Sequence, residues 1–170
     1  PIVVTGGNGS QCHGIPGDTV IKKGDFITMD TGAMLRGYHS DMTRTVALGY
    51  VSDEQKAVYD TVLKAQLAAI DAVHAGVCCS DVDKVARDII ETPYPGTFGH
   101  GLGHGVGFEI HEWPRFSARD NTICEPGMVI TVEPGIYIAG KCGVRIEDMI
   151  VVTEDGCRNL THSPKALMIL

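Results

Sequence analysis

Basic clusters, long apolar runs and paired cysteines are all missing from the 170-residue sequence. Its 14 lysines and arginines are outnumbered by 21 aspartates and glutamates, and the net charge of −7 argues against a surface for nucleic acid or anionic lipid. No apolar run reaches the roughly 18 to 20 residues of a membrane span, and no targeting segment is recognisable. We therefore expect a cytoplasmic protein that acts on a small substrate, with no nucleic-acid or membrane partner.

The six cysteines include no C-x-x-C motif, and the adjacent pair Cys78 and Cys79 is poorly placed to form a disulfide. We expect all six to be free thiols in a reducing compartment. A chain of this length buries roughly 70% of its unfolded surface, which is enough to fold without disulfides.

Neither an internal repeat nor a linker-like change in composition divides the sequence, so we expect one domain over residues 1–170. The first residues, Pro1-Ile-Val-Val, are typical of an interior strand and include no initiator methionine. We expect the domain to be the C-terminal fragment of a longer chain.

Alternating β-rich segments predict two pairs of antiparallel strands. Residues 24–35 and 38–49 flank an Arg36-Gly37 turn, which predicts a β-hairpin. Residues 127–138 and 143–156 predict two further strands joined by a glycine-rich connection.

Two helices are predicted between these strand pairs. The first begins at Ser52 and carries apolar residues at helical spacing until Gly76 ends it. The second begins at Ser80, has Asp83 in the capping-box position and ends before Pro93. Helices that are segregated from antiparallel strands indicate an α+β fold, and we expect both helices to cover the sheet without taking part in chemistry.

Four carboxylates lie in β-prone, largely apolar sequence, although strands are depleted in acidic residues. Asp30 and Asp41 lie on the two arms of the hairpin, and Glu133 and Glu147 lie in "VITVEPG" and "GVRIEDMIVV". A solvated sheet face would explain one or two of them, but four that converge in one cleft repel one another and are costly to bury without counter-charge. Two divalent cations would cancel four carboxylates, which predicts a dinuclear metal centre with room for one imidazole.

The segment "GHGLGHGVGFEIHE" (99–112) supplies three histidines, His100, His104 and His111, on a glycine-rich backbone. The spacing alone leaves open which of them binds metal, because this much glycine disfavours a helix on which two histidines would share a face. We predict an irregular or twisted strand, in which glycine lets backbone and substrate approach closely. A lone histidine is usually a structural residue, whereas three beside four carboxylates favour a functional site.

In order along the chain, "DTGAMLRGYHSDMTRT", "GHGLGHGVGFEIHE", "TVEPGIY" and "GVRIEDMIVV" resemble the signature segments of the pita-bread metallopeptidases. This family includes methionine aminopeptidase, Xaa-Pro aminopeptidase and prolidase, and the resemblance extends from about Asn8 to the C-terminus. It implies a pita-bread fold, a curved antiparallel sheet covered by helices, here incomplete at the N-terminus. It also implies a set of metal ligands: Asp30, Asp41, His104, Glu133 and Glu147.

The proline-specific branch of the family is the closer match. His100, four residues before His104, and the "GVRIED" strand with Arg145 resemble that branch, which includes Xaa-Pro aminopeptidase and Xaa-Pro dipeptidase. Methionine aminopeptidases typically lack the "HGLGH" pair.

The same resemblance implies roles for the residues around the ligands. His13, in "NGSQCHG", would bind substrate, and His100 and His111 would hydrogen-bond the substrate or the developing oxyanion. Glu133 would pass a proton toward the leaving amine. Arg145, placed with the substrate-binding residues, would orient a neighbouring carboxylate ligand.

These assignments predict hydrolysis of the Xaa-Pro bond at the N-terminus of peptides or in dipeptides by a hydroxide that bridges two metal ions. One nitrogen and otherwise carboxylate oxygens favour Mn²⁺, although Co²⁺ or Zn²⁺ can occupy such a site. The partner is the peptide substrate, and we expect the full-length protein to be a homodimer. A methionine aminopeptidase, a metal-free binding module and an inactive fragment with the same fold stay open as alternatives.

Overall fold

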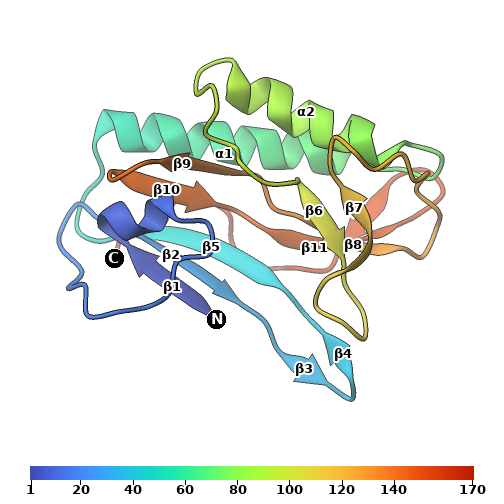
Figure 1. The fold of residues 1–170 in the computed structure, drawn as a ribbon, viewed down its shortest axis with the longest axis horizontal. Coiled ribbons are helices and arrows are strands. Elements are labelled where there is room, and N and C mark those ends of the chain that lie inside the picture. Colours follow the sequence, from blue (N-terminus) through green and yellow to red (C-terminus); the bar gives the residue numbers. More distant parts are fainter.

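The computed structural model describes residues 1–170 as antiparallel sheets that curve beneath two neighbouring helices, which confirms the α+β prediction (Figure 1). The N-terminal half contains β1 (Ile2–Thr5), a short 3-10 helix (Gly6–Ser10), β2 (Phe26–Thr31), β3 (Met34–Leu35), β4 (Tyr38–His39), β5 (Met42–Ala47), α1 (Asp53–Asp71) and α2 (Cys79–Glu91). The C-terminal half contains β6 (Gly103–Gly105), β7 (Glu112–Phe116), β8 (Val129–Val132), β9 (Gly135–Ile138), β10 (Cys142–Arg145), β11 (Asp148–Val152) and β12 (Cys157–Asn159). Neither helix combines the length and the apolar character needed to cross a bilayer.

Strands β1, β2 and β5 form one antiparallel sheet with β2 at its centre. The small β3–β4 ribbon joins β2 to β5 and projects away from the rest of the molecule (Figure 1). Its turn residues, Arg36 and Gly37, have φ values of 53° and 88°, as tight hairpin turns require, so the predicted hairpin is confirmed. The register sets Asp30 opposite Thr43, and Asp41 directly precedes β5 at the same end of the sheet.

A second sheet has the strand order β12-β11-β8-β6-β7, and a separate ribbon pairs β9 with β10. The prediction of two unbroken strands over 127–138 and 143–156 is wrong, because each segment divides into two strands that join different sheets. Pro134 offers no N–H to a sheet ladder, and the Glu147 N–H donates to a carbonyl of β5 at 3.1 Å. Glu133 and Glu147 therefore lie in the two breaks.

Helix α1 begins as predicted but ends earlier. The Ser52 hydroxyl accepts the Gln55 N–H at 3.1 Å, and the Gln55 side chain accepts the Ser52 N–H at 2.9 Å, which completes a capping box. The predicted continuation to Gly76 is wrong, since the helix stops at Asp71. The Gly76 N–H donates instead to the Cys124 carbonyl at 2.9 Å, which draws the chain away from the helix axis.

Helix α2 begins differently from the prediction. Its N-cap is Cys78, whose side chain makes no capping hydrogen bond, so the proposed capping box of Ser80 and Asp83 is wrong. Asp83 is fully buried and accepts hydrogen bonds from the Arg87 side chain and from the Leu102 N–H. Asp83 thus faces the segment that carries the histidines, away from the start of its own helix.

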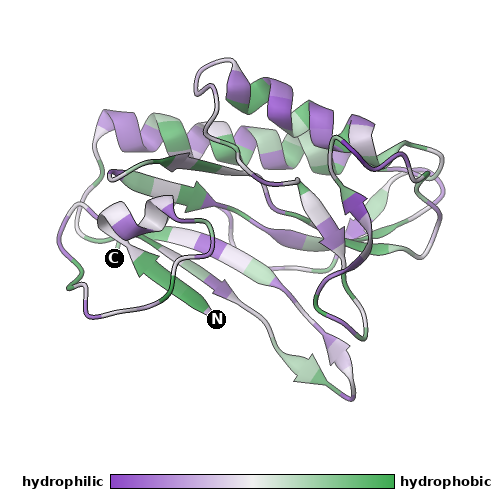
Figure 2. Ribbon diagram, in the orientation of Figure 1, coloured by the Kyte–Doolittle hydropathy of each residue, from purple (hydrophilic) through white to green (hydrophobic).

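The apolar core fills the space between the helices and the strands beneath them. Figure 2 shows hydrophobic and hydrophilic bands alternating along both helices, as expected when one helix face is buried. Tyr59, Ile90, Phe116 and Ile130 are less than 2% exposed. Burial of one such apolar side chain stabilises the fold by about 1.5–3 kcal/mol, so the core provides a rigid support for the residues of the site.

Candidate metal and substrate site

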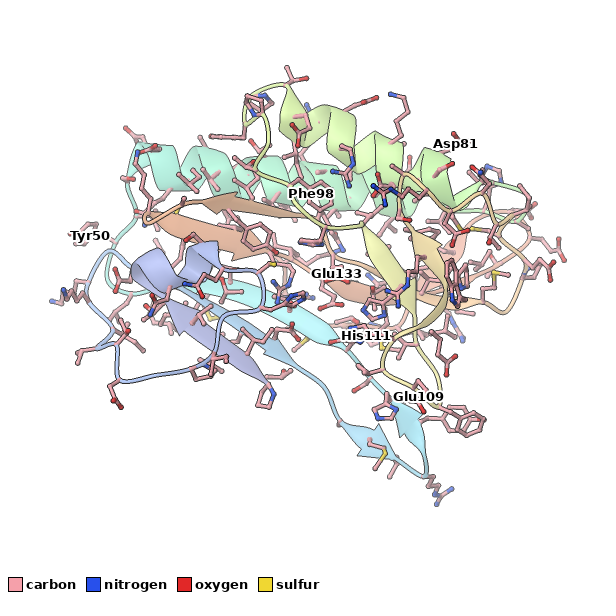
Figure 3. The ribbon with its side chains drawn as sticks, in the orientation of Figure 1. Tyr50, Asp81, Phe98, Glu109, His111 and Glu133 are labelled. Carbon is pink, nitrogen blue, oxygen red and sulfur yellow. The ribbon has the colours of Figure 1, made fainter.

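A cavity of about 820 Å³ is lined from both sheets, by residues of β2, β4, β6, β7 and β10 and of the loops between them. In Figure 3, Glu133 and His111 lie near each other between the two groups of strands. Glu147 is 1% exposed and does not itself line the cavity. All other site residues predicted from the sequence line it: His13, Asp30, Asp41, His100, His104, His111, Glu133 and Arg145.

His104 is the centre of the acidic cluster. Its Nδ1 lies 3.0 Å from the Gly105 carbonyl oxygen and donates to it, so Nε2, the nitrogen that would bind a cation, faces the carboxylates. Nε2 lies 3.3 Å from Glu133 Oε1 and 3.7 Å from Asp41 Oδ2. Asp41, His104 and Glu147 each offer one ligand atom, and these atoms all lie within 4.8 Å of one another.

Arg145 and His104 compensate the charges of this cluster only in part. Burial, followed by the charges of Asp30 and Glu133, raises the pKa of Asp41 to about 6. Burial, followed by the charges of Glu133 and Asp41, raises the pKa of Glu147 well above its usual value. Glu147 Oε1 is the one buried side-chain oxygen in the protein that lacks a hydrogen-bond partner. Buried oxygen donors that repel one another and leave one lone pair unused fit a divalent cation.

Two threonines hold the glutamates in place. The Thr43 hydroxyl donates to Glu147 Oε2 at 2.6 Å, and the Thr131 hydroxyl donates to Glu133 Oε1 at 3.3 Å. Thr131 also accepts the His104 N–H at 3.0 Å. Neither threonine was predicted as a site residue, although Thr131 precedes Glu133 by two residues, the spacing that sets side chains on one face of an extended backbone.

Arg145 links Asp30 to the other side of the cavity. Its Nη2 donates to Asp30 Oδ2 at 2.6 Å, and its Nη1 donates to the Tyr137 hydroxyl at 2.9 Å. The Tyr137 hydroxyl lies 2.8 Å from His100 Nε2, and His100 Nδ1 lies 2.8 Å from the Gly101 carbonyl oxygen. Arg145 therefore orients a predicted ligand, and both ring nitrogens of His100 have protein partners. Tyr137 was not foreseen as a member of this network.

His111 and His13 are the exposed imidazoles of the cavity wall. The rings of His111 and His104 stack edge to face with centroids 4.4 Å apart. Burial, followed by the charge of His104, lowers the pKa of His111, so its ring is neutral near pH 7. His13 lies beside Cys12 on the same cavity wall. Both rings are free to hydrogen-bond a bound molecule.

Arg115 is a further cation of the cavity that the sequence analysis did not single out. It lies on β7, directly opposite His104 of β6, and it lines the cavity. No carboxylate lies within 4 Å of its guanidinium group, whereas Arg145 is paired with Asp30. An unpaired guanidinium group in the cavity suits a carboxylate of a bound molecule.

The glycines around His104 are required by strand packing. A Cβ atom on Gly103 would overlap the carbonyl oxygen of Thr131 on β8, and one on Gly105 would lie 2.6 Å from the carbonyl oxygen of Trp113 on β7. Strand β6 thus packs closely against both β7 and β8. Its pairing with β7 shifts register after His104. Of the segment 99–112, for which an irregular strand was predicted, Gly103–Gly105 form one, Glu112 begins β7, and the remaining residues are not in strands.

Known proteins match this chain along most of its length. The sequence profile of metallopeptidase family M24 matches residues 1–154. The chain belongs to this family. An Xaa-Pro dipeptidase of Pyrococcus furiosus is 45% identical over 168 residues, which cover 98% of this chain and 48% of the relative.

Solved M24 structures confirm the pita-bread fold. The Xaa-Pro dipeptidase from Bacillus anthracis has a TM-score of 0.97 at 49% identity and covers 99% of this chain and 48% of its own. The X-Pro aminopeptidase from Thermotoga maritima has a TM-score of 0.96 at 44% identity, with 99% and 48% covered. The chain thus spans about half the length of the relatives it matches.

Proposed function

We propose that the whole protein hydrolyses the Xaa-Pro bond of dipeptides or of peptide N-termini. The observation that carries the proposal is the buried cluster of carboxylates around His104, with one oxygen of Glu147 left unpartnered, at a cavity in an M24 chain. The relatives named as Xaa-Pro dipeptidase and X-Pro aminopeptidase support the choice of substrate.

Two divalent ions would be held by the five predicted ligands, and we propose manganese because most of the donors are hard carboxylate oxygens. When bound, the ions would activate water and polarise the carbonyl group under attack. The ligands are Asp30, Asp41, His104, Glu133 and Glu147.

Glu133 is the proposed proton carrier. Although burial opposes it, the hydrogen bond with His104 and the charges of His100 and His104 lower the pKa of Glu133. Without metal, Glu133 is therefore ionised at neutral pH. In the loaded site we propose that Glu133 accepts a proton from the attacking water and passes it to the leaving amine. The hydrogen bond from Thr131 fixes one of its oxygens during this transfer.

His111 and His13 would bind the substrate. A neutral His111 ring beside His104 can donate to the carbonyl oxygen as negative charge develops on it, an interaction worth about 2.7–4 kcal/mol at comparable sites. Arg115 would pair with the free carboxylate of a dipeptide. His100 would shape the cavity wall through its contact with Tyr137.

Assays of the whole protein with Mn²⁺ test the proposal against methionine aminopeptidase activity. We expect hydrolysis of an Xaa-Pro dipeptide or an Xaa-Pro-Yaa tripeptide, no hydrolysis of a Met-Ala peptide, and loss of activity after chelation. The variant Glu54→Gln, at an exposed pair with Lys141, serves as a control that retains activity. Faster cleavage of Met-Ala peptides, or no cleavage by protein with bound metal, would contradict the proposal.

A further inference from the structure

Helix α2 carries a charged pair on the side that faces the histidine segment. Arg87 donates to both carboxylate oxygens of Asp83, from Nε at 2.8 Å and from Nη2 at 3.0 Å. The Asp83 side chain is 1% exposed, and its Oδ1 also accepts the Leu102 N–H at 3.0 Å. The pair therefore reaches from the helix to the backbone beside His104.

Arg87 also binds the backbone on both sides of Gly99. Its Nη1 donates to the Phe98 carbonyl at 2.9 Å, and its Nη2 donates to the His100 carbonyl at 2.8 Å. The guanidinium carbon lies 4.4 Å from the centre of the Phe98 ring, close enough for a cation–π contact. These are the only hydrogen bonds that hold the backbone of residues 98–100.

The segment needs such support because Gly99 and Gly101 flank His100. Glycine restricts the backbone least of all residues, so the residues that flank His100 do not fix its backbone conformation. The His100 ring stands edge-on to Phe98, with centroids 5.1 Å apart, and its Nε2 meets the Tyr137 hydroxyl at 2.8 Å. Figure 3 shows Phe98 between the helices and the strands that carry the site.

The exposed pair of Lys84 and Asp88 on the same helix gives a contrast. Both side chains are more than 60% exposed, and Lys84 binds no group other than Asp88. Such a pair contributes a few tenths of a kcal/mol to the helix. Arg87 has the same spacing to its partner but binds two carbonyl groups of another segment in addition.

We infer that Asp83 and Arg87 are positioning residues that hold His100 in the wall of the cavity. The inference rests on the proposed function only in treating that wall as the substrate site. The guanidinium group of Arg87 binds both oxygens of a carboxylate and two carbonyls together, which takes four N–H donors where a lysine has three. The expectation that the helices take no part in the chemistry is thereby modified, since α2 sets the position of a residue of the site.

Arg87→Lys in the whole protein tests the inference, because it keeps the charge beside Asp83 and removes the fork. We expect faster hydrogen–deuterium exchange in peptides that span residues 98–102, at the Leu102 amide that donates to Asp83, with unchanged metal content. Lys84→Arg, at the exposed pair, is the matched control and leaves exchange unchanged. This readout is independent of activity, so it holds even if the proposed substrate is wrong.

A double-mutant cycle with His100→Ala then tests whether Arg87 acts through His100. We expect Arg87→Lys to lower kcat/KM for an Xaa-Pro substrate by about 10- to 100-fold, as misplaced groups do. In the His100→Ala background, the same change is expected to have little further effect. Equal losses in both backgrounds, or unchanged exchange in residues 98–102, would overturn the inference. Absence of all Xaa-Pro hydrolysis by the wild type would refute the proposed function alone.

Discussion

Replacement of Glu147 by glutamine removes one charge from the cluster and preserves its shape. Glu147 is 1% exposed and its Oε1 has no hydrogen-bond partner. Burial, followed by the charges of Glu133 and Asp41, raises its pKa. Glutamine keeps an oxygen that can accept the Thr43 hydroxyl and adds an amide that can donate to a neighbouring carboxylate. A buried group without a partner costs about 1–3 kcal/mol. Without metal, we therefore expect Glu147→Gln to raise the free energy of unfolding by about this amount.

Mn²⁺ is expected to reverse the order of stability. A ligand at 100 times its Kd stabilises the folded state by about 2.7 kcal/mol. The wild type, which has all its carboxylates, should gain this much stability from Mn²⁺. The variant lacks one anionic ligand and gains much less. The variant should therefore have the higher free energy of unfolding with a chelator, and the wild type should have the higher one with Mn²⁺.

Denaturant unfolding of the whole protein, with a chelator and then with Mn²⁺, measures both effects. Glu54→Gln is the control, because the Glu54 side chain is 64% exposed and its removal should shift neither curve. A Glu147→Gln protein that is less stable than wild type without metal, and that responds equally to Mn²⁺, would refute the electrostatic reasoning.

Three further predictions concern single side chains. His104→Ala should lose bound metal and turnover, whereas His100→Ala should keep its metal and lose roughly 100-fold in turnover because the cavity wall beside the substrate is misplaced; metal analysis beside activity separates the two. Gly103→Ala should lower the free energy of unfolding by about 1–3 kcal/mol, since its Cβ overlaps the neighbouring strand, while Gly99→Ala, with no atom within 4 Å, should change melting temperature little. Arg115→Gln should raise KM for an Xaa-Pro dipeptide more than for the same dipeptide with an amidated C-terminus; equal effects would remove the proposed carboxylate contact.

Local chemistry made part of the fold predictable. The Arg36-Gly37 turn could be located because few residues accept two successive positive φ values, and turn residues act over four positions only. The capping box at Ser52 is likewise complete within four residues. In both cases the residues that determine the structure are neighbours in the sequence.

Distant contacts decided the features that the sequence did not predict. The strand break at Glu147 depends on a hydrogen bond to β5, about 100 residues away, and nothing in "GVRIEDMIVV" signals it. Asp83 matches a capping-box pattern, but its buried carboxylate accepts the Leu102 N–H and does not cap its own helix. Acidic residues in apolar strands did mark candidate ligands, because their burial is unfavourable without a compensating charge. Their partners, such as Tyr137, carry no comparable local signal.

The junction of the two sheets at Glu147 is held by contacts within the protein. The Glu147 N–H donates to the Thr43 carbonyl at 3.1 Å, and Arg44 donates to the Glu147 carbonyl at 2.5 Å. Arg44 also pairs with the buried Asp148 at 2.8 Å, and Lys165 pairs with the same carboxylate at 2.7 Å. The backbone on both sides of Glu147 is thus fixed from β5. Because the backbone beside Glu147 is already ordered, we expect an incoming cation to bind without the cost of ordering it, which favours tight binding.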